Sequence, residues 1–484
     1  MVETQNRDLR APLPGRNLHS VSSNDDLRTR LAVFDAEIAQ LQTSLDQLIL
    51  ARAPVASALD SIVYPILTLP PEITAEIFLH YVDDEPLKLP KSYRRNRISG
   101  PPLLASVCQA WRGIAIHLQT LWSDIKVDDT ASETLIQCCL ARAKDHPLSL
   151  NLKLFQPDGH RILTAFASHV MQWESIKWKL EFPVVAQMNE IQGRLVLLKK
   201  LVLARYAMLS VPETATPITG FASAPMLREV HLHDIPPALV LLPWAQLTYL
   251  SCWRHTTQEI FEMLHQTRDL EKLNIHDPED FQDEAPPPVQ LRNLHTLMIW
   301  DCESFRFLDN LSLPVLKRLI LSNDSQPASP SELLDLFVRS GCRLYNLTAT
   351  DFEYGFVLPL LEAMPTLSIV RLFDMNWDRD TEVISLFKRI TNDAEFLPNL
   401  GTLRIDWPFY GVPYEEVIQM LESRRYNRGD LGKLQVVRFE CGSWSDQAQN
   451  DMDVDHASAL MERLKALAAD GLEIYIPDMT PEMR

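Results

Sequence analysis

The sequence predicts an α/β protein in which an N-terminal helix and an all-α helical pair precede a long sheet of parallel strands. Three observations predict this class. Apolar residues follow heptad spacing between Leu27 and Leu48, form two helical faces between Leu69 and Trp122, and then recur in a six-residue unit from Leu198 to Phe439. These spacings match the periods of a coiled-coil helix, an α-helix and a strand.

The first part of the chain predicts one long helix after a polar leader. Residues 1–24 are polar and contain Pro12 and Pro14, so we expect them to be disordered. Residues 25–60 are expected to form a helix that Pro54 ends or kinks. Its apolar seam consists of Leu27, Leu31, Phe34, Ile38, Leu41, Leu45 and Leu48. A coiled-coil dimer seam and a single amphipathic helix folded back on the body both fit this pattern.

Residues 66–123 predict a pair of helices joined by a polar loop, Asp83–Pro102. Pro70 and Pro71 fit the first turn of the first helix, where a missing N–H costs nothing. Its apolar face is Ile73, Ile77, Phe78 and Tyr81; the second face is Leu104, Val107, Cys108, Trp111, Ile114, Ala115 and Leu118. A unit of ~50 residues buries little surface alone. Part of this surface is therefore expected to bind a partner helix, and a hairpin packed only on its own chain is the alternative.

The order of these residues carries a family resemblance. Leu-Pro-Pro-Glu-Ile at 69–73, Ile-Phe at 77–78, Val-Cys at 107–108, Trp-Arg at 111–112 and Leu-Trp at 121–122 together resemble an F-box. F-box proteins dock this motif onto the Skp-type adaptor of cullin–RING ubiquitin ligases, and the long loop resembles those of the large F-box families of mushroom-forming fungi. The resemblance implies that adaptor docking or its support falls to Leu69, Pro70, Ile73, Ile77, Phe78, Val107, Cys108, Trp111, Ile114 and Trp122.

Beyond Trp122 strands and helices alternate, which indicates parallel strands. The expected elements are a strand at 125–127, a helix at 133–143, a strand at 148–154 and a helix at 161–172. Residues 124–476 are read as one repeat domain, with a last strand at 471–476 and a frayed tail at 477–484. Return helices are expected at 331–340, 382–390, 415–421 and 458–467.

Apolar residues at positions 1, 4 and 6 define the repeat, at intervals of about 20 to 34 residues. The units begin at Leu198, Leu227, Leu247, Leu270, Leu294, Leu316, Leu344, Leu367, Leu400 and Leu434, and Trp173 may be read as an earlier start. This pattern resembles a leucine-rich-repeat solenoid over about two thirds of the chain. The asparagine usual three residues past position 6 is mostly missing, so we expect an irregular α/β solenoid.

The residue after position 6 points out of the sheet on the face opposite the core. Neighbouring strands lie ~4.8 Å apart. Trp253, His276 and Trp300 are therefore expected to form a column, and with Phe373 they are the predicted target-binding residues. Packing under the loops that leave each strand is the alternative.

Composition excludes several classes of function. The net charge of −18 disfavours nucleic-acid binding, and no run approaches the ~20 apolar residues of a membrane span. The N-terminal residues have no apolar signal-peptide core, and seven cysteines without framework spacing fit reduced thiols inside a cell. Cytoplasm and nucleus both stay open. The basic cluster Lys91, Arg94, Arg95 and Arg97 is a nuclear import signal or a solvated loop.

We find no motif for chemistry. Glycine-rich phosphate loops and Cys-x-x-Cys pairs are missing, and His231 and His233 fit surface imidazoles on a strand better than metal ligands. No cofactor is expected. The F-box and repeat resemblances together imply a non-catalytic, substrate-recognition subunit of a Skp–cullin–F-box ubiquitin ligase, which binds the Skp-type adaptor and cullin at one end and an unknown target protein on the repeats. A repeat scaffold without a ligase role and a hidden hydrolase or transferase are the alternatives.

Overall fold

A computed structural model describes residues 24–60, 65–84, 87–89, 100–129, 131–154, 159–180, 186–205, 216–279, 286–323, 329–377, 380–407, 413–426, 433–441 and 454–475. The chain divides into two compact units, Met1–Thr74 and Ala75–Arg484, and each is described by itself. The predictions of a disordered leader, of a basic loop signal at 91–97 and of a frayed tail lie outside the described residues.

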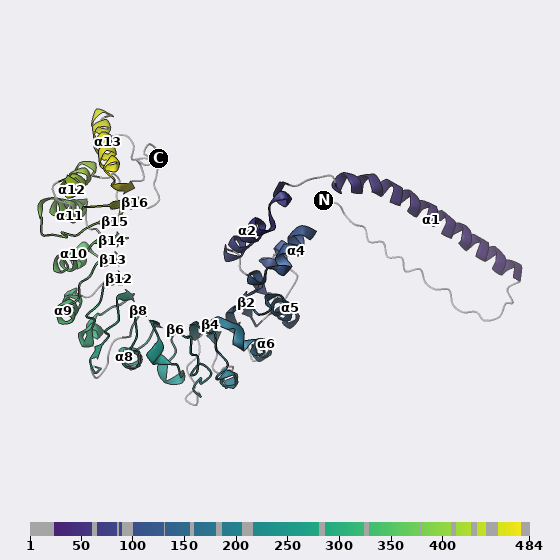
Figure 1. Cartoon of the computed structure of the whole chain (residues 1–484), viewed down its shortest axis with the longest axis horizontal. Helices are drawn as coiled ribbons and strands as arrows, with labels where there is room; N and C mark the ends of the chain where they lie inside the picture. The colour runs from purple at the N-terminus through teal and green to yellow at the C-terminus, as the bar shows by residue number, and fades with distance from the viewer. Residues whose placement is uncertain are drawn as a thin grey trace. The chain divides into compact units, whose positions relative to one another are not determined.

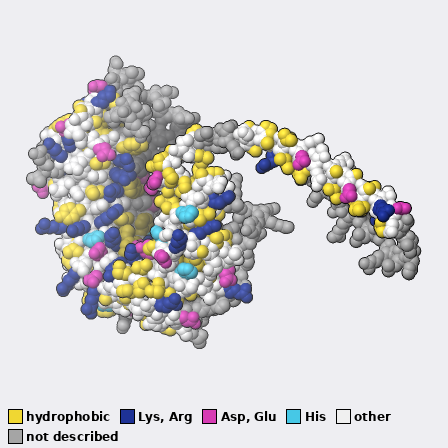
Figure 2. Space-filling model, turned by 45° about the vertical axis from the view of Figure 1, so that its right-hand side comes forward, with side chains coloured by type: hydrophobic (Ala, Val, Ile, Leu, Met, Phe, Trp, Pro, Cys, Tyr) yellow, Lys and Arg dark blue, Asp and Glu magenta, His cyan; other side chains and the backbone are white. Residues whose placement is uncertain are grey.

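The first unit contains one long helix, α1 (Asn24–Asp60), and the 3-10 turn η1 (Pro65–Thr68). Pro54 lies inside α1, so of the two predicted outcomes it does not end the helix, and a kink stays a prediction. Its ring removes one backbone donor, yet helical geometry continues to Asp60. The heptad residues from Leu27 to Leu48 are exposed, and Figure 2 shows yellow apolar side chains along the helix at the right. This leaves both interpretations of the seam open.

The second unit begins within α2 (Pro71–Asp84), which is followed by α3 (Pro101–Val107), α4 (Gln109–His117) and the 3-10 turn η2 (Gln119–Trp122). The second predicted apolar face is therefore divided between two helices. Cys108 separates them with an extended backbone (φ −154°, ψ 172°), and its Sγ accepts a hydrogen bond from the Trp111 N–H at 3.4 Å. The thiol thus caps α4 at a break that apolar spacing alone did not reveal.

A parallel sheet of fifteen strands runs through the described part of the second unit, with neighbouring strands in chain order. The chain is thus a mixed α/β protein with one large, open parallel sheet. The strands are β1 (Leu87–Leu89), β2 (Asp124–Asp128), β3 (Leu148–Leu154), β4 (Trp173–Leu180), β5 (Lys200–Arg205), β6 (Glu229–His233), β7 (Tyr249–Trp253), β8 (Lys272–His276), β10 (Thr296–Trp300), β12 (Arg318–Ser322), β13 (Asn346–Thr350), β14 (Ile369–Phe373), β15 (Thr402–Trp407), β16 (Val436–Cys441) and β17 (Glu473–Tyr475).

Helices connect many of these strands. They are α5 (Glu133–Ala143), α6 (Gly159–Ala167), α8 (Thr257–Gln266), α9 (Ser331–Ser340), α10 (Tyr354–Ala363), α11 (Asp380–Asn392), α12 (Tyr414–Tyr426) and α13 (Val454–Ala469), with 3-10 turns η3 (Val170–Gln172), η4 (Ala186–Ile191), η5 (Pro237–Leu239), η6 (Trp244–Gln246) and η7 (Arg306–Asn310). A second, two-stranded sheet pairs β9 (Val289–Gln290) with β11 (Leu311–Ser312). Figure 1 shows the strands of the second unit along the inner side of a curve and the helices on its outer side.

Several other predicted elements are confirmed, and two more differ. The strands at 125–127 and 148–154 and the helices at 133–143 and 331–340 are present. The helix predicted over 161–172 ends at Ala167 and is followed by η3. The loop predicted over 83–102 contains β1, which pairs in parallel with β2 through Leu87 and Ile125. Three residues are too short a run for period-two alternation to be recognised.

The repeat register is confirmed by burial and by pairing. In β8, Leu273 and Ile275 are fully buried, and they align with Leu297 and Ile299 of β10. All the apolar positions of the weakest unit, which begins at Leu344, are buried as well. Because side chains alternate along a strand, the residues between them lie on the inner face.

Each of several strands ends in a residue with left-handed backbone geometry. These residues are Asp234, Arg254, Asp277, Asp301, Asp351 and Asp374. The N–H of Asp234 donates to the Trp253 carbonyl at 2.8 Å, and the N–H of Asp277 donates to the Trp300 carbonyl at 2.9 Å. Aspartate tolerates this conformation better than most side chains. An acidic residue two positions past position 6 is therefore a sequence signal of this turn, with Arg254 as the exception.

Candidate partner-binding surfaces

Several side chains of the helical segment from α2 to η2 are buried in the hydrophobic core that continues into the sheet. Phe78 and Trp122 are fully buried, and the Phe78 ring meets Trp111 edge-on at 5.0 Å. The Trp122 indole N–H donates to the Ala115 carbonyl at 2.7 Å, and the guanidinium carbon of Arg142 lies 4.2 Å from the centre of the Trp122 ring. Phe78 and Trp122 therefore support this segment from inside and offer no surface to a partner.

Other apolar side chains of the same segment face solvent. In the second unit, Ile77 is 44% exposed and Val107 is 57% exposed. Ile73, in the first unit, lies one turn before Ile77 on α2 and is also exposed. Covering one such side chain contributes about 1.5–3 kcal/mol. Of the other predicted docking residues, Pro70 is exposed, and Leu69, Cys108, Trp111 and Ile114 are half-buried.

The inner face of the sheet carries a continuous column of rings. His233, Trp253, His276 and Trp300 pair in register on β6, β7, β8 and β10. Successive ring centres lie 5.2, 5.0 and 5.4 Å apart, with interplanar angles of 33°, 14° and 6°. The predicted column of Trp253, His276 and Trp300 is thus confirmed, and His233 extends it. Trp253 is 43% exposed, so its ring is not packed under a loop.

Asn274 holds the column from the middle row of the inner face. Its side-chain oxygen accepts the Trp300 indole N–H at 2.8 Å. Its amide nitrogen lies 3.1 Å from His276 Nε2 and 3.3 Å from Ser251 Oγ. Because one amide orients two rings on adjacent strands, the stack is a fixed surface rather than a set of independent side chains.

The imidazoles in this region are neutral at physiological pH. Burial lowers the pKa of His233 to about 4, and the neighbouring charges of His231 and Lys177 lower it further. Burial is also the main cause of the lowered pKa of His276. Uncharged imidazoles stack on indoles without a desolvated charge between the rings. The ring column is therefore uncharged at pH values above the pKa values of His233 and His276.

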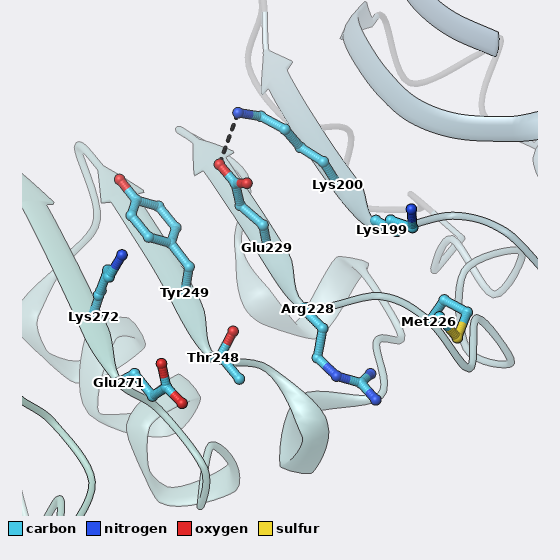
Figure 3. A pocket seen from close by; sticks show the side chains of 9 residues that line it. All are labelled: Lys199, Lys200, Met226, Arg228, Glu229, Thr248, Tyr249, Glu271 and Lys272. Atoms are coloured by element: carbon cyan, nitrogen blue, oxygen red, sulfur yellow. Dashed lines mark ion pairs between the residues drawn. The ribbon is translucent and has the colours of Figure 1, made fainter. Parts of the chain in front are cut away.

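A polar groove lies beside the column, where β5 to β8 begin (Figure 3). Its volume is about 530 Å³. Its charged lining is Lys199, Lys200, Arg228, Glu229, Glu271 and Lys272. Lys200 Nζ lies 2.7 Å from Glu229 Oε1, and the same oxygen lies 2.7 Å from His231 Nε2. Four cations and two carboxylates line the groove, and Lys199 and Lys200 are already paired with Glu174 and Glu229, so much of the positive charge is neutralised.

Phe373, the fourth predicted target-binding residue, does not join the column. The residues aligned between Trp300 and Phe373 are Ser322 on β12 and Thr350 on β13. The guanidinium carbon of Arg404 lies 5.5 Å from the centre of the Phe373 ring. The target-binding role of all four residues stays a prediction.

Sequence reasoning missed a row of arginines in the middle of the inner face. Arg371, Arg404 and Arg438 align on the adjacent strands β14, β15 and β16. Burial lowers the pKa of Arg371, and the charges of Arg318 and Arg404 lower it further. The signal was readable, because all three arginines occupy position 5 of their repeat units, between the two buried residues.

Known proteins provide no further guidance. No model of a protein family matches the chain, and a search of curated proteins found no significant match. Among the described residues, no group of histidine, cysteine and acidic side chains is placed to hold a metal ion. No described helix is both long enough and apolar enough to cross a membrane.

Proposed function

We propose that this chain is a substrate-recognition subunit of a Skp–cullin–F-box ubiquitin ligase. The segment 66–123 would be an F-box that docks a Skp-type adaptor, and the repeats would form a leucine-rich-repeat-like solenoid that binds a target protein. The chain itself would make and break no bonds. It would hold target lysines near the ubiquitin carrier, which raises their effective concentration.

One observation supports this proposal most directly. The helical segment completes a core with Phe78 and Trp122, yet Ile77 and Val107 remain outside it. Ile77 and Val107 are therefore two large apolar side chains of this short segment that a second protein could cover. This division also matches the F-box resemblance, in which the same run of residues supplies both internal support and adaptor contacts.

The fifteen-stranded sheet supports the second half of the proposal. Consecutive parallel strands place one residue from each repeat in a row, so the inner face presents a long surface of side chains. The rings from His233 to Trp300 give that surface an apolar part. Aromatic side chains of this kind are common anchors in protein interfaces.

Binding to a purified Skp-type adaptor tests the proposal. Ile77→Asp combined with Val107→Asp should lower adaptor affinity at least about 100-fold, because two charges would be desolvated at the contact. Val338→Asp is the matched control, since Val338 is 84% exposed on α9 and lies far along the chain from this segment. All variants should keep the wild-type melting temperature. A wild-type chain that forms no complex at micromolar concentrations would favour the repeat scaffold instead.

A further inference from the structure

On the inner face, two small residues separate two aromatic side chains, and this stretch is called the notch below. Trp300 on β10 and Phe373 on β14 lie three strand spacings apart, about 14 Å. The two aligned positions between them hold the small residues Ser322 and Thr350. His276 stacks on one face of Trp300, so the other face of the indole is directed toward Ser322.

The floor of the notch is formed by Ser322 and Thr350, and two further residues border it. Ile320 and Thr348 align in the middle row on β12 and β13, directly beside the two small residues. Ile320 is half-buried, whereas Thr348 is only 8% exposed. The Thr348 hydroxyl is buried and has no hydrogen-bond partner among the described residues. An apolar side chain that enters between Trp300 and Phe373 would therefore lie over the small residues Ser322 and Thr350 and beside the half-buried Ile320.

Positive charge borders this notch on one side. Arg371 is the middle-row neighbour of Thr348, and Arg404 is the next residue in that row. Among the described residues, Arg371 donates to Asn346 Oδ1 at 3.0 Å, and a guanidinium carries five N–H donors in all. Asp406 is the acidic residue of the end row on β15, two residues after Arg404. The net charge of the whole chain is −18, so clustered cations on one face are a local feature.

We infer that this notch binds an extended peptide segment of the partner protein, in which an apolar side chain is followed by an anionic group. The apolar side chain enters between Trp300 and Phe373, and the anionic oxygens accept hydrogen bonds from Arg371. Residues i and i+2 of an extended peptide lie on one side, about 7 Å apart. The anionic group is therefore placed two residues from the apolar one. This inference rests on the proposed target-binding role of the sheet.

The chemistry of the site favours a peptide over a small anion. A guanidinium pairs with a carboxylate or a phosphate in two parallel hydrogen bonds, which fixes the orientation of the anion. The ring faces of Trp300 and Phe373 bind apolar groups without polar partners. Only a peptide that carries both an apolar side chain and an anionic group contacts both the aromatic rings and Arg371. The aligned strands allow such a peptide to bind in an extended conformation.

Selection from a random-peptide library displayed on phage, with the full-length chain as bait, is the first test. The enriched peptides should share Leu, Phe or Trp followed two residues later by Asp or Glu. A failure to enrich any peptide, or enrichment without an acidic residue, would overturn the inference.

A synthetic peptide with the enriched sequence then separates the contributions. Replacing its acidic residue with glutamine should weaken binding about tenfold or more. Replacement with phosphoserine should keep or strengthen binding and identifies phosphate as the better anion, whereas preference for glutamate identifies the carboxylate. Either preference supports the inference, and equal binding of the glutamine peptide contradicts it.

Two variants of the chain locate the contact. Arg371→Glu should weaken the acidic peptide about tenfold or more, and Ser322→Phe should weaken it by filling the notch beside Trp300. Arg343→Glu is the matched control, because Arg343 is exposed on the loop before β13. Unchanged binding in both Arg371→Glu and Ser322→Phe would overturn the inference.

Adaptor binding, measured on the same preparations, distinguishes the two proposals. A chain that binds the Skp-type adaptor but no acidic peptide contradicts only the notch. A chain that binds the peptide but no adaptor contradicts only the ligase role. Melting curves of Ser322→Phe and Arg371→Glu should match the wild type, since neither side chain is in the buried core.

Discussion

The helical segment α2–η2 and the parallel sheet differ in how completely they bury their apolar side chains. In the sheet, the residues at repeat positions 1, 4 and 6 are buried by the chain's own connections, as Leu273 and Ile275 illustrate. In the helical segment, Phe78 is buried to the same degree, while its neighbour Ile77 is not. The repeat positions of the sheet are therefore buried within the chain, whereas the helical segment leaves Ile77 and Val107 exposed.

This difference predicts that substitutions in the two regions affect different properties of the protein. A substitution in the sheet core should act on folding, whereas a substitution at Ile77 should act on binding. The inner face of the sheet is a third case, because its rings are ordered by Asn274 and by each other while they stay accessible. The following variants break or sharpen the comparison, from the largest expected effect to the smallest.

Leu273→Asp should unfold the sheet. Leu273 is fully buried on β8, and an uncompensated buried charge costs several kcal/mol, which is comparable to the whole stability of a domain. We expect loss of the cooperative melting transition in circular dichroism. Ile77→Asp serves as the comparison and should melt like the wild type; a similar loss in that variant would mean that Ile77 belongs to the core.

Phe78→Ala should destabilise the helical segment by about 3–5 kcal/mol, because it removes a fully buried ring and its contact with Trp111. Ile77→Ala, one residue away, should cost less than about 0.5 kcal/mol. Hydrogen exchange of α4, followed by mass spectrometry, measures both. Equal deprotection by the two variants would remove the distinction between core and exposed residues on α2.

Asn274→Ala should cost about 1–2 kcal/mol, because the Trp300 indole N–H loses its acceptor. Chemical denaturation gives the free energy, and tryptophan fluorescence should shift as the Trp300 ring becomes less constrained. Ser251→Ala removes only a longer contact at 3.3 Å and should have a smaller effect. If both variants behave alike, Asn274 does not organise the column.

Acidic pH should lower stability slightly through His233. Its folded-state pKa is about 4, below the ordinary value of 6.5, so the unfolded chain binds more protons between these values. The stability that depends on a neutral His233 is therefore fully present above pH 6.5 and is lost as the pH falls toward 4. The wild type should melt at a lower temperature at pH 5 than at pH 7. In His233→Gln, this decrease in melting temperature should be smaller by a few degrees. An identical pH dependence in both proteins contradicts the neutral, stacked imidazole.

The sheet was largely predictable from sequence, and the binding surfaces were only partly so. Alternation fixes which side chains are buried, so Leu273, Ile275 and His276 were placed correctly with no other information. The division of the second helix at Cys108 was not predictable, because apolar spacing continues across it from Leu104 to Trp111. Spacing reports which face is apolar, but not where a backbone leaves helical geometry.

The separation of core from exposed residues was also beyond the sequence. Ile77 and Phe78 are adjacent apolar residues on one helix, and only the position of Trp111 decides which of them is covered. The arginine row was readable at position 5 of the repeats, but its meaning depends on the register of β14 to β16. Local pattern thus predicts elements, while a site is defined by pairing between distant segments.

Hydrogen exchange of the full chain, measured alone and with a purified Skp-type adaptor, tests the central claim most directly. We predict that the adaptor slows exchange in α2, α3 and α4 and leaves β5 to β16 unchanged, because Ile77 and Val107 become covered. Absence of a complex, or protection confined to the sheet with α2–α4 unaffected, would contradict the assignment of this apolar surface to a partner.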